Sequence, residues 1–232
     1  MLLPERRRAK PQTTNLPASV LAVLAAFVFL PAVAVASPAT ALKAFNAGQF
    51  TNALTEYERL LTEQTKQQKP EDPRLHFNAG AVAYRAANYT AALQHFTSVL
   101  SAPDIQLQAQ AYYNLGNVHF RLGQQAENLD KLEESWKEAI NQYQHVLALE
   151  KSDPDATFNL AFVEAQVKQI ALMRELARQA KAAADTATRQ RNYRRAREIM
   201  EQLLQGNAAA KPFEEFTKKL KDIDEITNPS QP

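Results

Sequence analysis

The sequence predicts an all-α fold in which pairs of helices stack into a solenoid. Apolar residues recur at three- and four-residue spacing along the chain, the period of an amphipathic helix, and no segment keeps the two-residue alternation of a strand. Only five glycines interrupt the 232 residues. A short pattern also repeats, in which an aromatic residue precedes a small alanine by three positions and a large residue follows that alanine by four. Together these observations predict repeated helix pairs.

The repeated pattern marks the second helix of each pair. On a helix, its small residue admits a neighbouring backbone, and its large residue fills the space one turn further on. The four copies, of which the last is the weakest, contain Phe50, Ala53 and Tyr57; Tyr89, Ala92 and Phe96; Trp136, Ala139 and Tyr143; and Tyr193, Ala196 and Met200.

The first helices of the pairs repeat as well. Asn78-Ala79-Gly80 aligns with Asn114-Leu115-Gly116 and with Asn159-Leu160-Ala161. The last two of these segments are further apart in sequence than the first two, which indicates an insertion. We place it at residues 125–135 and expect a solvated segment whose removal leaves the helicity nearly intact, because inserted loops carry little closure cost.

Each glycine has an expected place in this repeat. Gly48 and Gly123 are expected in the turn between two helices, and Gly80 and Gly116 are expected where helices approach closely. Gly206 is expected to end a helix with a positive φ, which glycine adopts without a steric penalty.

Two successive regions follow from the helix boundaries. Residues 37–154 hold three helix pairs, and Asp153-Pro154 places a capping carboxylate before a first-turn proline, a preferred helix start. Residues 155–227 hold a long helix from Asp155 to about Ala187, a hairpin that turns near Arg191-Asn192, and a final helix that serves as a cap. Residues 228–232 are predicted to form a disordered tail.

Residues 1–36 have the features of a secretory signal peptide. A basic stretch ends at Lys10, an apolar run extends from Val20 to Leu30, and Ala34-Val35-Ala36 offers a small-residue cleavage site. The apolar run before Pro31 is short for a bilayer span, which needs ~20 residues. We expect a periplasmic or secreted protein; the alternative is an uncleaved N-terminal helix that anchors the chain in the inner membrane, facing the periplasm.

Charge and cysteine content exclude several classes. The formal net charge of +2 depends on the basic residues of the first ten positions, so the remainder carries no basic excess and nucleic-acid binding is not expected. The chain has no cysteine, so it forms no disulfide and is not a lipoprotein.

One repeat carries a recognisable motif. Tyr112-x2-Leu115-Gly116-x2-His119, followed by Ala139-x3-Tyr143 and Pro154, resembles the tetratricopeptide repeat, although His119 stands where an aromatic residue is usual. The resemblance implies a solenoid of helix pairs with a concave face that binds a partner protein.

The segment from Ala109 to Val167 also resembles the tetratricopeptide proteins of Bat (aerotolerance) operons. Members of that group accompany membrane proteins with a von Willebrand A domain. This resemblance implies such a membrane protein as a partner of the chain.

The first helix of each pair lines the concave face in this fold, and helical spacing selects the side chains that point outward from it. They form an aromatic band that two arginines flank, and its two asparagines stand where some family members hold a peptide backbone. We expect either an open groove or a core buried under the terminal helices. The candidate groove residues are Phe77, Tyr84, Arg85, Tyr113, Asn117, Phe120, Arg121, Phe158, Asn159 and Phe162.

No catalytic or cofactor-binding constellation is found in the sequence. The four histidines are not spaced to share a helix face, and no nucleophile elbow, phosphate loop or zinc-protease motif is present. We therefore predict no enzymatic activity, no metal site and no cofactor.

Two functions remain. The first is an exported scaffold of the bacterial cell envelope that binds a partner protein or peptide through its concave face. The second is a structural subunit that assembles into a homo-oligomer and has no peptide-binding groove.

Overall fold

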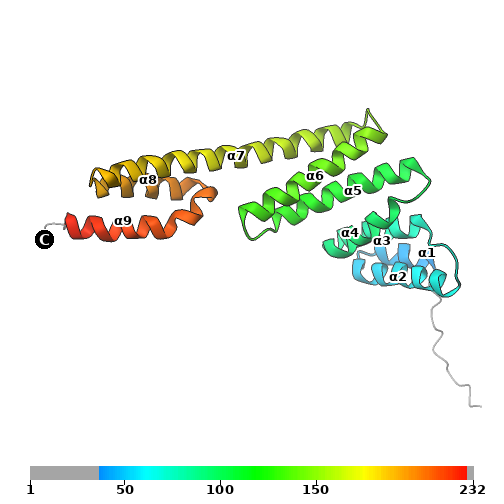
Figure 1. Cartoon of the computed structure of the whole chain (residues 1–232). Coiled ribbons are helices and arrows are strands. Elements are labelled where there is room, and N and C mark those ends of the chain that lie inside the picture. Colours follow the sequence, from blue (N-terminus) through cyan, green and yellow to red (C-terminus); the bar gives the residue numbers. More distant parts are fainter. Residues whose placement is uncertain (1–36, 229–232) are drawn as a thin grey trace, which may run out of the picture. The chain divides into compact units, whose positions relative to one another are not determined.

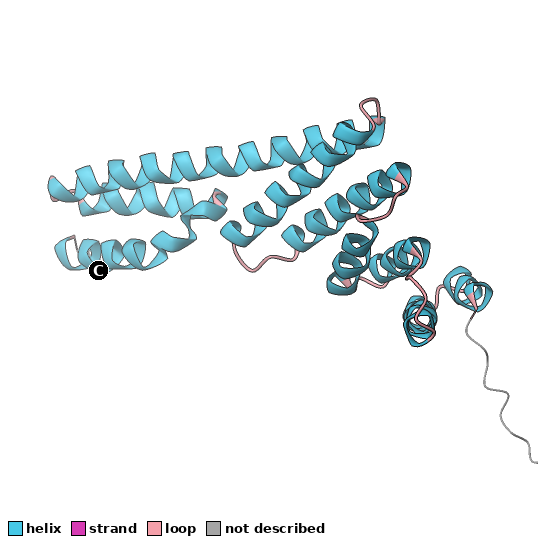
Figure 2. Cartoon of the chain, turned by 45° about the vertical axis from the view of Figure 1, so that its right-hand side comes forward, coloured by secondary structure: helices cyan, strands magenta, loops and turns pink. Residues whose placement is uncertain are grey.

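The computed structural model describes residues 37–228 of the chain. The predicted signal peptide and residues 229–232 of the predicted tail lie outside the described residues. Within the described range the fold is all-α, as predicted, and contains no strand (Figures 1 and 2). The elements are α1 (Pro38–Asn46), α2 (Phe50–Lys66), α3 (Pro73–Arg85), α4 (Tyr89–Val99), α5 (Ile105–Gln124), α6 (Leu129–Leu149), α7 (Pro154–Arg189), α8 (Tyr193–Gly206), the 3-10 helix η1 (Ala208–Phe213) and α9 (Glu214–Thr227).

Each α-helix packs against the next one along the chain, from α1 to α9 (Figure 1). This is the arrangement of a helix-pair solenoid, in which contacts form between sequence neighbours. None of the described helices is long and apolar enough to cross a membrane.

The repeated alanines and large residues are at the contacts between helices, as the pattern predicts. In every pair the alanine is fully buried, and the large residue four positions later is buried beside it. Gly80 and Gly116 are also confirmed as close contacts, because a Cβ added at either would lie 2.8 or 2.5 Å from the ring of Phe96 or Tyr143. The buried residues of the pattern are Ala53, Ala92, Ala139, Ala196, Tyr57, Phe96, Tyr143 and Met200.

Three of the pairs share one turn geometry. Gly48, Ala87 and Arg191 follow the first helix of their pairs with φ of 73°, 56° and 58°, the left-handed conformation. In each turn, two backbone N–H groups bond back to the helix in the Schellman pattern, for example Ala87 N–H to Tyr84 O and Asn88 N–H to Ala83 O. Only Gly48 of these three residues adopts that φ without a penalty.

The third pair departs from this geometry, and two expectations for it are wrong. Gly123 does not lie in the turn: it lies inside α5, where a Cβ would be 2.3 Å from the indole of Trp136. Residues 125–135 are not an inserted loop, because α6 begins at Leu129 and only residues 125–128 connect the two helices. The extra residues lengthen the helices, and they do so because the sequence from Leu129 onward keeps an apolar face that packs against α5 and α7.

The long helix α7 comprises 36 residues, about 54 Å at 1.5 Å per residue. It packs against α6 and also against α8, so it belongs to two hairpins at once. Gly206 ends α8, as expected, but not with a positive φ: Gly48 is the one glycine of the described residues in that conformation. Asn207 follows with an extended backbone, φ −132° and ψ 106°, and its side chain accepts the Ala209 N–H at the start of η1.

Candidate functional site

Seven of the ten candidate groove residues come together in one cavity of 300 Å³, here called the aromatic pocket. It lies between α5 and α7, with Tyr84 of α3 at its edge. Phe158 and Phe162 are 70% and 44% exposed, so the C-terminal helices do not bury them, and the groove is open at this point. The lining residues are Tyr84, Asn117, Phe120, Arg121, Tyr143, Phe158, Asn159, Phe162 and Val163.

Aromatic contacts fix the walls of the aromatic pocket. The ring of Phe162 stacks on Phe158 at 6.5 Å and meets the edge of Phe120 at 5.9 Å between ring centroids. Behind Phe120, the indole of Trp136 stacks at 5.5 Å and donates its Nε1–H to the Phe120 carbonyl oxygen at 3.1 Å. The absence of a side chain at Gly123 gives the indole its space. The pocket therefore has a rigid aromatic wall before any ligand arrives.

Two tyrosines orient the two asparagines. The Tyr143 hydroxyl donates to Asn117 Oδ1 at 2.8 Å, and Asn159 Nδ2 donates to the Tyr113 hydroxyl at 3.1 Å. Burial raises the pKa of Tyr143, so its hydroxyl stays protonated and remains a donor. These bonds leave the Asn117 amide N–H free to donate and the Asn159 carbonyl oxygen free to accept a hydrogen bond. A peptide group has one C=O and one N–H, so it can bond to both asparagines.

Arg121 is the one charged residue that lines the aromatic pocket. Its Nε–H donates to the Tyr84 hydroxyl at 3.3 Å, and its Nη1 donates to Gln124 Oε1 at 3.0 Å. The two bonds hold the guanidinium at the edge of the pocket.

The structure does not bring Phe77, Arg85 and Tyr113 into the aromatic pocket. Arg85 was expected to flank the groove at the place that matches Arg121; instead its guanidinium lies 5.3 Å from the ring centroid of Phe50 on α2. The cation–π attraction of that ring turns Arg85 away. Its assignment to the groove is therefore corrected.

Phe77 and Tyr113 line a second cavity, of 160 Å³, here called the acidic pocket. Three acidic residues line it: Glu150, at the end of α6, and Asp153 and Asp155, at the start of α7. The other lining residues are Ala109, Gln110 and Asn114.

Sequence reasoning missed Tyr143, Val163 and the acidic pocket. Tyr143 was assigned to packing, and it does pack, but its hydroxyl also reaches the groove amide of Asn117. No local pattern could reveal the acidic pocket, because its residues come from three helices and the α6–α7 turn.

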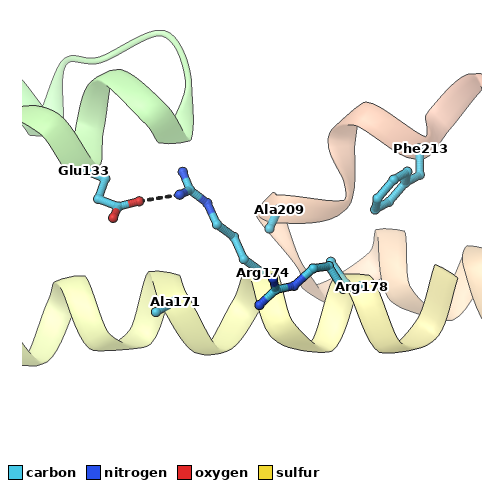
Figure 3. Close-up of a pocket in the computed structure, with 7 residues that line it drawn as sticks. Glu133, Ala171, Arg174, Arg178, Ala209 and Phe213 are labelled. Carbon is cyan, nitrogen blue, oxygen red and sulfur yellow. Dashed lines mark ion pairs between the residues drawn. The ribbon is translucent and has the colours of Figure 1, made fainter. Parts of the chain in front are cut away.

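A further cavity, of 480 Å³, lies between the start of α6, the middle of α7 and the 3-10 helix η1. Figure 3 shows Arg174 extending from α7 toward Glu133, with Ala209 and Phe213 of η1 on the other side. Arg174 binds Glu133 Oε2 at 2.6 Å and Asp130 Oδ1 at 2.5 Å. These ion pairs connect the start of α6 to α7, a structural role. Among residues 37–228, no three acidic, histidine or cysteine side chains lie close enough together to hold a metal ion.

Comparison with known proteins identifies the repeat. Residues 39–106 and 82–137 match the tetratricopeptide repeat family. Among solved structures, a thermophilic TPR protein of Thermus thermophilus is similar, with 15% sequence identity, a TM-score of 0.46, and coverage of 80% of this chain and 95% of that one. No curated protein matches the chain in sequence.

Proposed function

We propose that this chain, whose residues 39–137 match the tetratricopeptide repeat, is an interaction scaffold that binds an extended segment of a partner protein in the aromatic pocket. The observation that carries the proposal is the exposure of Phe158, which is 70% accessible although its ring stacks on that of Phe162. Large apolar side chains gathered on an open surface mark interaction sites.

The amide pair supports an extended peptide as the ligand. Asn117 and Asn159 offer a donor and an acceptor beside an apolar wall, and their tyrosine partners fix their orientation in advance. Pre-organised groups lose less conformational entropy when a ligand binds. A few oriented polar groups in an apolar cleft are also typical of ligand sites.

Site-specific photo-crosslinking tests the proposal in cells. A photoreactive phenylalanine analogue replaces Phe158 in one strain and Leu172 in another. Both residues are exposed on α7, and they are about 21 Å apart along that helix at 1.5 Å per residue. We expect adducts with one defined partner from position 158 and not from 172. Equal labelling at both positions, or no adduct at 158, contradicts the proposal.

The same experiment tests self-association, the second candidate. Leu172 and Leu176 are 51% and 49% exposed on α7, and a cavity of 410 Å³ beside Leu176 is lined largely by apolar residues of α7 and α8. An adduct between two copies of the chain at position 172, together with a dimer in light scattering, would favour the homo-oligomer. A monomer in solution would remove this alternative.

We further propose that the protein works in the bacterial cell envelope and that its partner is a membrane protein with a von Willebrand A domain. The composition of residues 1–36 supports export, and the resemblance of the segment from Ala109 to Val167 to proteins of Bat operons supports the partner. Cell fractionation with N-terminal sequencing tests the location: a cytoplasmic chain that begins at Met1 contradicts it. Mass spectrometry of the Phe158 adduct tests the partner.

A further inference from the structure

The aromatic pocket and the acidic pocket are neighbours along the same helices. Residues of α5 and α7 line both cavities. Tyr113 lines the acidic pocket and Asn159 lines the aromatic pocket, and the two side chains share a hydrogen bond of 3.1 Å. The Tyr113–Asn159 pair therefore lies at the boundary between the two cavities.

The two cavities differ in charge. Three carboxylates line the acidic pocket, and none of the ion pairs in the described part of the chain involves any of them. Asp153 has a structural role, because its Oδ1 accepts the Ala156 N–H at 2.8 Å and caps α7. Glu150 has no such bond, and it lies at the C-terminal end of α6, where the helix dipole adds negative charge. Asp153 and Asp155 lie at the N-terminal end of α7, where the positive end of the dipole offsets part of their charge. In the aromatic pocket the charged lining residue is the cation Arg121.

The distance between the cavities follows from the helices that line both. On α5 the lining residues of the two cavities are centred about eight positions apart, and on α7 about five, which corresponds to about 8–12 Å at 1.5 Å per residue. An extended chain covers that distance in about three residues.

We propose that the bound segment carries a lysine or arginine that enters the acidic pocket and, about three residues away, a large apolar or aromatic side chain that enters the aromatic pocket. The inference rests on the proposed function and specifies its ligand. A cation in the acidic pocket interacts with the carboxylates of Glu150 and Asp155, which have no ion pair or hydrogen bond within the described residues, whereas an acidic side chain there meets three like charges. Arg121 repels the cation from the other cavity, so the charges also set the direction of the segment.

Selection from a random dodecapeptide library displayed on phage tests the inference. The bait is the full chain, and the matched control is the Phe158→Ser/Phe162→Ser variant, whose substitutions fall on exposed side chains. We expect enriched peptides with Lys or Arg two to four positions from Phe, Tyr, Trp or Leu, and no such enrichment on the control.

Fluorescence anisotropy then measures the charge dependence with one enriched peptide and its Lys→Gln and Lys→Glu versions. We expect affinity to fall about three- to tenfold with glutamine and further with glutamate, and the difference to shrink in high salt. The Glu150→Gln/Asp155→Asn variant should lose most of the preference for lysine over glutamine, because only Asp153 of the three carboxylates remains. Asp222→Asn, on the exposed surface of α9, should retain the preference.

The outcomes separate the two proposals. Peptides enriched for aromatic residues without a basic residue, or affinities unchanged by Lys→Glu, overturn this inference and leave the proposed function intact. A selection without enrichment, or one that enriches the same peptides on the Phe158→Ser/Phe162→Ser control, overturns both.

Discussion

The Nδ1 atoms of His76 on α3 and His95 on α4 face each other at 3.2 Å. Because one imidazole must donate and the other accept at that distance, only one of the two Nδ1 atoms carries a proton. A carboxylate faces each Nε2: Glu71 at 2.9 Å from His76 and Glu58, on α2, at 3.7 Å from His95. A second cationic charge would place two N–H groups head to head and break the bond between the helices.

Stability should therefore depend on pH. Burial, together with the neighbouring His76, lowers the pKa of His95, so the unfolded chain binds a proton more readily than the folded one. The contribution is fully present above about pH 6.5, the ordinary histidine pKa, and is lost as the pH falls below it. We expect urea unfolding to show a lower free energy at pH 5 than at pH 7.5, with a total loss at lower pH of about 1 kcal/mol, the contribution of one hydrogen bond.

His95→Gln is the test variant, and its unfolding free energy should depend less on pH between 7.5 and 5 than that of the unmodified chain. Burial lowers the pKa of His119 as well, so His119→Gln should remove a different part of the dependence. An unchanged slope in His95→Gln contradicts the assignment.

The left-handed turns predict stabilising substitutions. Ala87 has φ of 56° and an exposed side chain, so Ala87→Gly should relieve steric strain and stabilise the fold by about 0.5–1 kcal/mol in urea denaturation. Ala86, one residue earlier, has φ of −77°, and Ala86→Gly should destabilise instead because it only adds freedom to the unfolded chain. The same sign for both substitutions would refute this account of the turn.

The close contacts at the glycines predict destabilising substitutions. A Cβ at Gly116 would lie 2.5 Å from the Tyr143 ring, so Gly116→Ala should lower the unfolding free energy by about 1–3 kcal/mol. It should also disturb the Tyr143–Asn117 bond and weaken peptide binding. Gly206→Ala is the control: nothing lies within 4 Å of its Cβ and its φ is not positive, so no loss is expected. Thermal melting of both variants is the measurement.

Deletion of residues 125–135 should now be harmful, contrary to the expectation from the sequence. It removes the α5–α6 connection and the start of α6, including Asp130 and Glu133, which bind Arg174. The new junction would unwind the end of α5 and the start of α6 and expose the indole of Trp136, the single tryptophan, which stacks on Phe120. We expect lower ellipticity and a red-shifted emission. Substitution of residues 125–127 by Gly-Ser-Gly, which keeps Asn128 as the cap, should leave both signals near those of the unmodified chain.

The accuracy of prediction from the sequence differed with the range of the interaction. The buried pattern of Ala92 and Phe96 follows from helical periodicity, which short stretches of sequence contain. Gly123 was misplaced because a glycine in a turn and a glycine under an indole have the same local sequence context, and only the position of Trp136 distinguishes them.

At the candidate site, too, local patterns were predicted correctly and contacts between distant residues were not. Helical spacing was sufficient to select Phe120, Phe158 and Phe162, since each points from the first helix of a pair toward one face. It could not predict that Arg85 turns to Phe50, because the two lie on helices of different pairs.

The sequence by itself determined the helix pairs, their order and most of the aromatic wall, because a repeat places equivalent side chains at equivalent positions along neighbouring helices. Only the tertiary structure decided that the groove stays open at Phe158, that tyrosines orient Asn117 and Asn159, and that three acidic residues line a cavity beside Tyr113. Those properties depend on how far each helix extends before the chain turns and on which side chains from other helices then come within a few ångströms. The periodicity of a single helix indicates neither where the chain turns nor which side chains of other helices lie nearby.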